Sequence, residues 1–399
     1  MSKYFLGVDV STTASKALII DVDGNVLVTK GNSHELSTPR PLWSEQDPEN
    51  WWQAASKSIR EVLQQIPAEQ IAAIGLTGQM HGLTSLDRDG KPVRPAILWN
   101  DQRSTAQCAA ITARVGEKHL YQHIGSILLA GFTAPKIMWV RENEPDVYQR
   151  IAHVLLPKDY IRYRLSGAFV ADVADASGFG LMDIGKRDWS DEMLAAFDIP
   201  HSWLPELCES PEVCAYVSEE GAAATGLKVG TPIVGGAGDQ PASGVGNGIV
   251  VKNQTSLTIG TSGVAYAASD RYAPEPDGRL NQEIEYSCPA ASIMFFYKNT
   301  HSPVKHPHII HAAFTGTLSF KMYDTGAGKI IVLIPGLLYT VTKINVFPVH
   351  EKGLIKAAYL FQHFSPDHHE STGQYIHFVV FVFIQVAEVI TGKCAGTGK

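Results

Sequence analysis

The chain has 399 residues, more than one hydrophobic core usually serves, so two domains are expected. Hydrophobic residues make up 45% of the chain and charged residues 18%, as in an ordinary globular enzyme. The formal net charge is −7 and no basic run occurs, which argues against a nucleic-acid partner.

Neither a membrane nor an oxidising compartment is indicated. The five cysteines are scattered, without the close spacing of a metal site or a disulfide framework. A strand-like segment begins at Tyr4, which leaves no room for a signal peptide. The apolar stretch 375–390 (YIHFVVFVFIQVAEVI) is shorter than the roughly 20 residues of a membrane span and carries polar side chains, so we expect a buried strand or helix there. A cytoplasmic protein without a membrane partner is expected.

The first elements predict a β-meander. Residues 4–10 (YFLGVDV) favour a strand, a hydroxyl-rich turn follows at 11–16 (STTASK), and strands at 17–22 and 25–28 flank an Asp-Gly turn. Asp47 and Pro48 are typical of a helix start, and the helix is expected to reach Leu63. Further strands are expected near 70–74 and 231–234. They lead into the glycine-rich segments 75–82 (GLTGQMHG) and 235–240 (GGAGDQ).

A similar strand–turn–strand pattern recurs far downstream. Residues 256–260 (SLTIG) lead through a Thr-Ser-Gly turn into 264–268 (VAYAA). The repeat indicates a duplicated fold in which each half offers one turn to a shared ligand; two unrelated hairpins are the alternative. The glycines between 236 and 248 make this segment the expected hinge between domains, because glycine accommodates large backbone changes.

Two aspartates and one polar loop are the candidates for chemistry. Asp9 ends a strand beside a turn that can hold phosphate, where a carboxylate can hold Mg²⁺; capping of the turn is the alternative. Asp239 follows the glycines of the segment 235–240, and its carboxylate could act as the general base in phosphoryl transfer. The alternative is that Asp239 is a loop residue without a chemical role. Gln79, Met80 and His81 offer polar groups and one apolar surface to a polyol, although a lone loop histidine is more often structural.

Several segments together resemble the FGGY carbohydrate kinases. The most specific is 131–143 (GFTAPKIMWVREN), which fits a family signature with Lys136 and Trp139 three residues apart. The others keep the family's order and spacing across residues 4–280: 41–48 (PLWSEQDP), 98–103 (LWNDQR), 156–160 (LPKDY) and 258–263 (TIGTSG). The resemblance implies an α/β fold of the duplicated ribonuclease H-like (actin/hexokinase-type) class with two domains.

Within that family, residues 78–82 (GQMHG) resemble the members that phosphorylate D-xylulose to D-xylulose 5-phosphate. ATP and Mg²⁺ are the implied cofactors. A kinase for ribulose, glycerol or another polyol, and a sugar-binding protein that has lost ATP turnover, are the alternatives; a homodimer is left open. The resemblance implies that Asp239 and Asp9 are catalytic and that Asp9 also holds the metal. The implied substrate-binding residues are Gln79, Met80, His81, Asp239 and Gln240. The implied nucleotide-binding residues are Thr12, Thr13, Lys16, Gly260 and Thr261.

The resemblance implies a sugar-binding domain over 1–244 and a nucleotide-side domain over 245–399, atypical after residue 280. The composition also differs between the two parts of the chain: no arginine follows Arg279 and no tryptophan follows Trp203, whereas most histidines lie after residue 300. A divergent second domain, a reading-frame shift, or side chains other than those that the gene encodes would each explain this tail. Ser11 and Gln240 are smaller departures from the family, which more often has Gly and Asn there.

Overall fold

The computed structural model describes residues 3–250, 254–259, 262–269 and 272, and seven further strands between residues 281 and 361. The chain divides into two compact units, residues 1–296 with 379–399, and residues 297–378. The predicted element at 375–390 and the candidate residues Gly260 and Thr261 lie outside the described residues.

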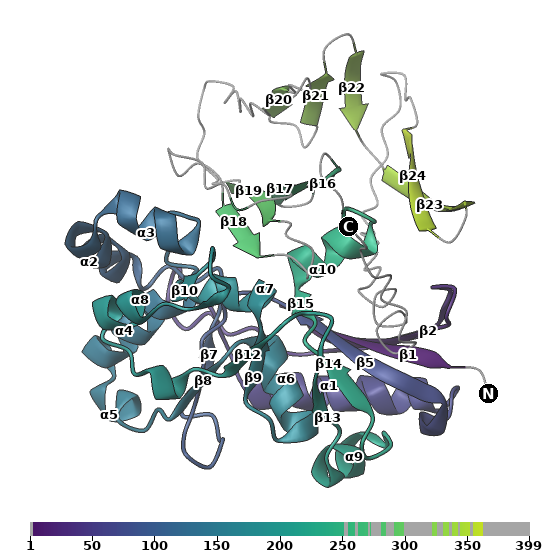
Figure 1. Cartoon of the computed structure of the whole chain (residues 1–399), viewed down its shortest axis with the longest axis horizontal. Helices are drawn as coiled ribbons and strands as arrows, with labels where there is room; N and C mark the ends of the chain where they lie inside the picture. Colours follow the sequence, from purple (N-terminus) through teal and green to yellow (C-terminus); the bar gives the residue numbers. More distant parts are fainter. Residues whose placement is uncertain are drawn as a thin grey trace, which may run out of the picture. The chain divides into compact units, whose positions relative to one another are not determined.

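A mixed sheet of seven strands forms the centre of the first unit (Figure 1). Its order is β13-β14-β5-β1-β2-β3, and β15 also pairs with β5. The predicted meander is confirmed, because β1, β2 and β3 pair antiparallel, whereas β5 lies parallel to β1, β14 and β15. The strands are β1 (Tyr4–Val10), β2 (Ala14–Ile20), β3 (Val26–Ser33), β5 (Ile71–Gly78), β13 (Val213–Tyr216), β14 (Pro232–Val234) and β15 (Ala237–Gly238).

Helices cover one face of this sheet. The helix predicted from Asp47 is α1 (Pro48–Leu63), and the Asp47 side chain accepts a hydrogen bond from the Glu49 N–H at 2.9 Å. Trp51 and Ile59 of α1 are fully buried in one core with residues of β1, β2 and β5. The other helices of this layer are α6 (Pro157–Ser166) and α9 (Glu219–Thr225).

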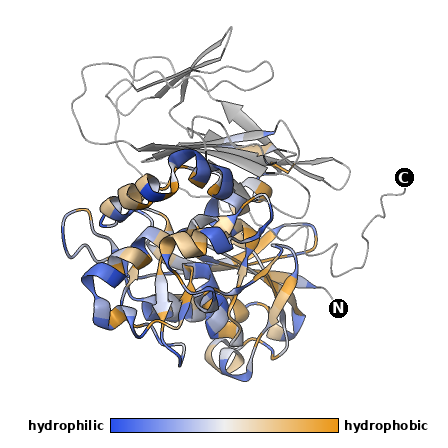
Figure 2. Cartoon of the chain, turned by 60° about the vertical axis from the view of Figure 1, so that its left-hand side comes forward, coloured by the Kyte–Doolittle hydropathy of each residue, from blue (hydrophilic) through white to orange (hydrophobic). Residues whose placement is uncertain are grey.

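A second core lies among helices beside the sheet. Figure 2 shows hydrophobic residues concentrated inside this region and on the strands, with hydrophilic residues outside. Its helices are α2 (Thr105–Val115), α3 (Glu117–Ile124), α4 (Thr133–Asn143), α5 (Pro145–Tyr148), α7 (Val173–Ala176) and α8 (Asp191–Phe197). Short elements connect them: β4 (Glu45–Gln46), β6 (Thr84–Leu86), β7 (Ala96–Ile97), β8 (His153–Leu155), β9 (Val170–Asp172), β10 (Met182–Asp183), β11 (Asp188–Trp189), β12 (Glu206–Cys208), η1 (Ala68–Gln70), η2 (Ser177–Phe179) and η3 (His201–Trp203).

The segment expected as a hinge contains a helix, α10 (Asp239–Gly246), directly after β15. The domain boundary predicted at residue 244 falls within this helix and stays a prediction. The second strand–turn–strand pattern is a hairpin, since β16 (Thr255–Ile259) and β17 (Ser262–Ser269) pair antiparallel. They belong to a sheet with β19 (Ala291–Lys298) and β18 (Asn281–Ile284).

The second unit contains two small antiparallel assemblies. One has three strands, β20 (Lys321–Asp324), β21 (Ile330–Ile334) and β22 (Leu337–Val341). The other is a hairpin of β23 (Ile344–Glu351) and β24 (Leu354–Phe361). Among the helices that the structure describes, none has the length and apolar character of a membrane span.

Candidate active site

Three parallel strands bring the candidate residues of the first 250 residues to one end of the sheet. Asp9 of β1 lies in register with Thr77 of β5, which in turn pairs with Ala237 of β15. One residue further along, Val10, Gly78 and Gly238 are neighbours in the same way. The loop with Gln79, Met80 and His81 follows β5, and Asp239 follows β15, so the two segments begin side by side. Ligands of α/β sheets commonly bind at the carboxyl ends of such strands.

The two aspartates are electrostatically coupled. Asp9 is buried. Lys16 of β2 is its neighbour in the antiparallel pair with β1, and Lys16 Nζ lies 3.5 Å from Asp9 Oδ2. Burial and the negative charge of Asp9 raise the pKa of Asp239 to about 7, although hydrogen bonds with Gln240 act in the opposite direction. A carboxylate whose pKa is near neutrality is a stronger base than an exposed carboxylate with its ordinary pKa, so it accepts a proton more readily.

The turn between β1 and β2 is attached to the loop after β5. Thr12 Oγ1 donates to Gln79 Oε1 at 3.3 Å and accepts from Trp99 Nε1 at 3.1 Å. Thr13 lies exposed in the same turn, next to Thr12. Trp99 is 41% exposed, unusually open for a tryptophan, and was not among the predicted site residues. Its position beside Thr12 places an apolar ring at the edge of the candidate site.

A buried amide network fixes Gln79. Its Nε2 donates to Gln46 Oε1 at 3.0 Å, and the same oxygen accepts from Trp51 Nε1 at 2.9 Å. Gln46 Nε2 in turn donates to the backbone oxygen of Thr12 at 2.7 Å. Sequence reasoning missed this role of Gln46, although the signal was present because it lies in the family segment 41–48.

Met80 and His81 each depend on a glycine. A Cβ on Gly238 would lie 2.5 Å from Met80 Cγ, so only glycine permits Met80 to pack directly before Asp239. His81 has a left-handed backbone with φ of 64°, which is uncommon outside glycine. Its Nδ1 lies 3.0 Å from Gly178 O, and because a carbonyl only accepts, Nδ1 carries the proton in the neutral ring. Nε2 is then the hydrogen-bond acceptor of the ring.

Lys136 of the family signature holds this unusual backbone. It is fully buried, and its Nζ donates to His81 O at 2.8 Å and to Gly131 O at 2.7 Å. Thr133 Oγ1 also donates to His81 O, at 3.1 Å. Burial lowers the pKa of Lys136 to about 7, yet either protonation state keeps two N–H groups for the two carbonyls. Lys136 thus fixes the backbone of the loop that contains Gln79, Met80 and His81.

A single arginine connects three of the family segments. Arg103 is buried between Trp43, at 3.8 Å from the ring centroid, and Trp139, at 5.0 Å. It forms a two-pronged ion pair with Asp101, with nitrogen–oxygen distances of 2.9 and 2.7 Å. Guanidinium stacking and bidentate pairing cannot be reproduced by lysine. The segments 41–48, 98–103 and 131–143 therefore form one structural support beneath the loops.

A buried charge cluster lies behind Gly235 and Gly238. Lys158 Nζ contacts Asp159 at 2.5 Å, Asp172 at 2.7 Å and Asp175 at 3.5 Å, and all four side chains are fully buried. The cluster also contains Arg162, which pairs with Asp159 at 2.6 Å and donates to Gly235 O. Burial raises the pKa of Asp175 well above its usual range. Since Lys158 already stands among the carboxylates, this cluster carries its own cation.

His81 predicts a pH effect on stability. Burial lowers the pKa of its ring from 6.5 to about 4 in the folded protein, so between these values the unfolded chain binds more protons. His81 therefore contributes stability above pH 6.5 that is lost as the pH falls toward 4, about 3 kcal/mol in all. We expect His81→Asn, which tolerates a left-handed backbone, to lose less stability over this range than the parent. Urea unfolding at pH 7 and pH 4.5 measures this, and equal losses in both proteins would contradict it.

Comparison with known proteins identifies the architecture. Residues 4–246 match the N-terminal domain of the FGGY family of carbohydrate kinases. The chain belongs to the FGGY family. The resemblance found in the sequence is thereby confirmed over residues 4–246. Of the nucleotide-side candidates of this FGGY chain, the structure describes Thr12 and Thr13 in the β1–β2 turn and Lys16 on β2.

Individual FGGY kinases are similar over most of the chain. The xylulose kinase of Escherichia coli (strain K12) is 40% identical over 277 residues, 69% of this chain and 57% of that protein. The xylulose kinase of Lactococcus lactis is 34% identical over 362 residues, 90% of this chain and 71% of that protein, so this alignment extends past residue 280. The crystal structure of xylulose kinase from Rhodospirillum rubrum is 28% identical, with a TM-score of 0.71 over 74% of this chain and 60% of that one.

These comparisons confirm the expected fold class, the ribonuclease H-like α/β fold of sugar kinases. The chain spans 57% of the E. coli relative and 60% of the R. rubrum structure.

Proposed function

We propose that this protein phosphorylates D-xylulose with ATP, giving D-xylulose 5-phosphate and ADP. The observation that supports it best is the meeting of Asp239, Asp9 and the Met80–His81 loop at the ends of three parallel strands. The similarity to xylulose kinases, at 40% identity to the E. coli protein, supports the choice of sugar.

In this proposal Asp239 is the general base. Its carboxylate removes the proton of the terminal sugar hydroxyl while that oxygen forms a bond to the γ-phosphorus of ATP and ADP leaves. Phosphoryl transfer relies chiefly on positioning and charge neutralisation, so one well-placed carboxylate is sufficient protein chemistry. The pKa of Asp239 near 7 keeps a large fraction of it ionised at neutral pH.

The loop with Gln79, Met80 and His81 (the substrate loop) would bind the ketose. His81 Nε2 would accept from a sugar hydroxyl, the amides of Gln79 and Gln240 would bond to neighbouring hydroxyls, and Met80 would contact carbon-bound hydrogens. Because His81, Met80 and Gln79 are each fixed by buried contacts, the loop is ordered before the sugar arrives. Such pre-organisation lowers the entropic cost of binding.

The residues present fit Mg²⁺. Asp9 is a buried carboxylate whose charge raises the pKa of Asp239, and a divalent cation beside Asp9 would offset that repulsion. When bound, the ion neutralises charge on the transferred phosphoryl group. Thr12, Thr13 and Lys16, together with Gly260 and Thr261, are proposed to line the phosphate path. The nucleotide-side domain is proposed to lie within 245–399.

A substrate panel tests the proposal. Full-length protein with ATP and Mg²⁺ is expected to turn over D-xylulose at a higher kcat/KM than D-ribulose or glycerol. Better activity with another polyol would replace the sugar and leave the family chemistry intact. Calorimetric binding of D-xylulose without ADP release from ATP would instead favour a sugar-binding protein that has lost turnover.

A further inference from the structure

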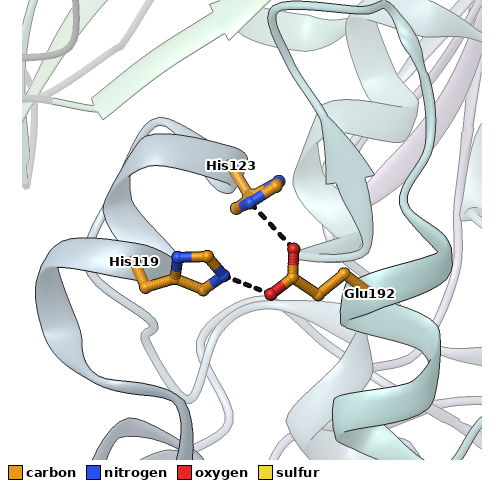
Figure 3. Close-up of side chains that lie close together, drawn as sticks. All are labelled: His119, His123 and Glu192. Atoms are coloured by element: carbon orange, nitrogen blue, oxygen red, sulfur yellow. Dashed lines mark hydrogen bonds and ion pairs between the residues drawn. The ribbon is translucent and has the colours of Figure 1, made fainter.

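Two histidines and one glutamate meet on the surface of the helical region, away from the sheet. His119 and His123 lie four residues apart on α3, so both side chains project from one face of that helix. Glu192 comes from the first turn of α8. Figure 3 shows both imidazoles pointing at the same carboxylate, one toward each oxygen.

The three donor atoms lie close enough together to share one metal ion. His119 Nε2 contacts Glu192 Oε1, and His123 Nε2 lies 3.3 Å from Glu192 Oε2. All three donor atoms lie within 4.8 Å of one another. Ligands about 2.0–2.1 Å from a tetrahedral Zn²⁺ are separated by roughly 3.3–3.4 Å, so small rotations would bring this set into place.

A second carboxylate lies beside one of the ligands. His123 Nδ1 lies 3.5 Å from Asp183 Oδ2, and Asp183 is itself paired with Lys186 at 3.0 Å. His123 Nδ1 is buried and makes no hydrogen bond at this distance, so Asp183 attracts the ring without fixing its tautomer. Metal-bound histidines commonly donate their other ring N–H to a carboxylate, and a small rotation would form that bond here. The ligand side chains are 41%, 18% and 56% exposed for His119, His123 and Glu192, so an ion can reach them from solvent.

We propose that His119, His123 and Glu192 form a surface site for a divalent transition metal of the Zn²⁺ type, with water completing the coordination. Two imidazoles and one carboxylate prefer such an ion over Mg²⁺, which selects oxygen ligands. The bound ion would join α3 to α8 and stabilise the helical region. The site is separate from Asp9 and does not depend on the proposed kinase reaction.

Zn²⁺ titration of untagged, chelator-treated full chain in millimolar Mg²⁺ tests the proposal. Compared with the parent, His123→Ala and Glu192→Gln are each expected to weaken one equivalent of Zn²⁺ binding by more than tenfold. His201→Ala, which removes an exposed histidine in η3, is the matched control and should bind like the parent. The histidines after residue 300 are present in every variant, so their Zn²⁺ binding cancels in the comparison.

Hydrogen exchange shows which helices the bound Zn²⁺ stabilises. One equivalent of Zn²⁺ is expected to slow exchange in α3 and α8 of the parent and of His201→Ala, but not of His123→Ala. Zn²⁺ binding of equal affinity and stoichiometry in the parent and His123→Ala, or no change in exchange at α3, would overturn the site.

Discussion

Replacing Asp239 with asparagine is expected to lower kcat for D-xylulose phosphorylation by about 10²–10⁴-fold, the usual contribution of a general base. Asparagine keeps the size of the side chain but cannot accept the hydroxyl proton. Sugar affinity should change little, because the proposed binding groups of Met80, His81 and Gln79 are fixed by contacts of their own. Steady-state kinetics and calorimetry of D-xylulose binding measure the two effects separately.

Asp146→Asn is the matched control, since Asp146 lies exposed on α5. It should leave both turnover and binding unchanged. A turnover of Asp239→Asn within threefold of the parent would remove Asp239 from the role of base. An equal loss of sugar affinity and turnover would make it a binding residue instead.

Lys158→Met is expected to have the largest effect on stability. The substitution leaves the carboxyl groups of Asp159, Asp172 and Asp175 buried without the cation that contacts all three. Breaking a buried ion pair by removal of one partner costs about 3–5 kcal/mol, because the remaining charge stays desolvated. Urea unfolding at pH 7 should show that loss.

The control is Lys57→Met, because Lys57 is exposed on α1 and its loss should cost less than about 0.5 kcal/mol. Part of the Lys158→Met loss should be regained at lower pH, where protonation neutralises the buried carboxyl groups. A loss for Lys158→Met no larger than that of Lys57→Met would show that the cluster contributes little to folding.

Much of the first domain followed from local signals. The meander of β1, β2 and β3 was predictable because runs of apolar β-formers flank short turns, one of them an Asp-Gly turn. Helix α1 was predictable because Asp47 and Pro48 mark its start. The convergence of Asp9 and Asp239 was predictable only through the family resemblance. Their adjacency depends on the parallel pairing of β5 with both β1 and β15, which no local pattern encodes.

The structural supports of the site were not predictable. Lys136 and Trp139 were recognised as a signature, but their roles depend on contacts with His81 and Arg103, distant in sequence. The buried cluster around Lys158 likewise requires Asp172 and Asp175 to fold back onto α6. Such roles follow from tertiary packing, so a single sequence can mark these residues without explaining them.

The most direct test of the proposed function is ADP release from ATP and Mg²⁺ by the full chain on addition of D-xylulose, with Asp239→Asn beside it. We expect sugar-dependent ADP release from the parent, a product phosphorylated on the terminal hydroxyl, and a loss of at least a hundredfold in the variant. ADP release that does not depend on the sugar, or none from a parent that binds D-xylulose, would contradict the proposal.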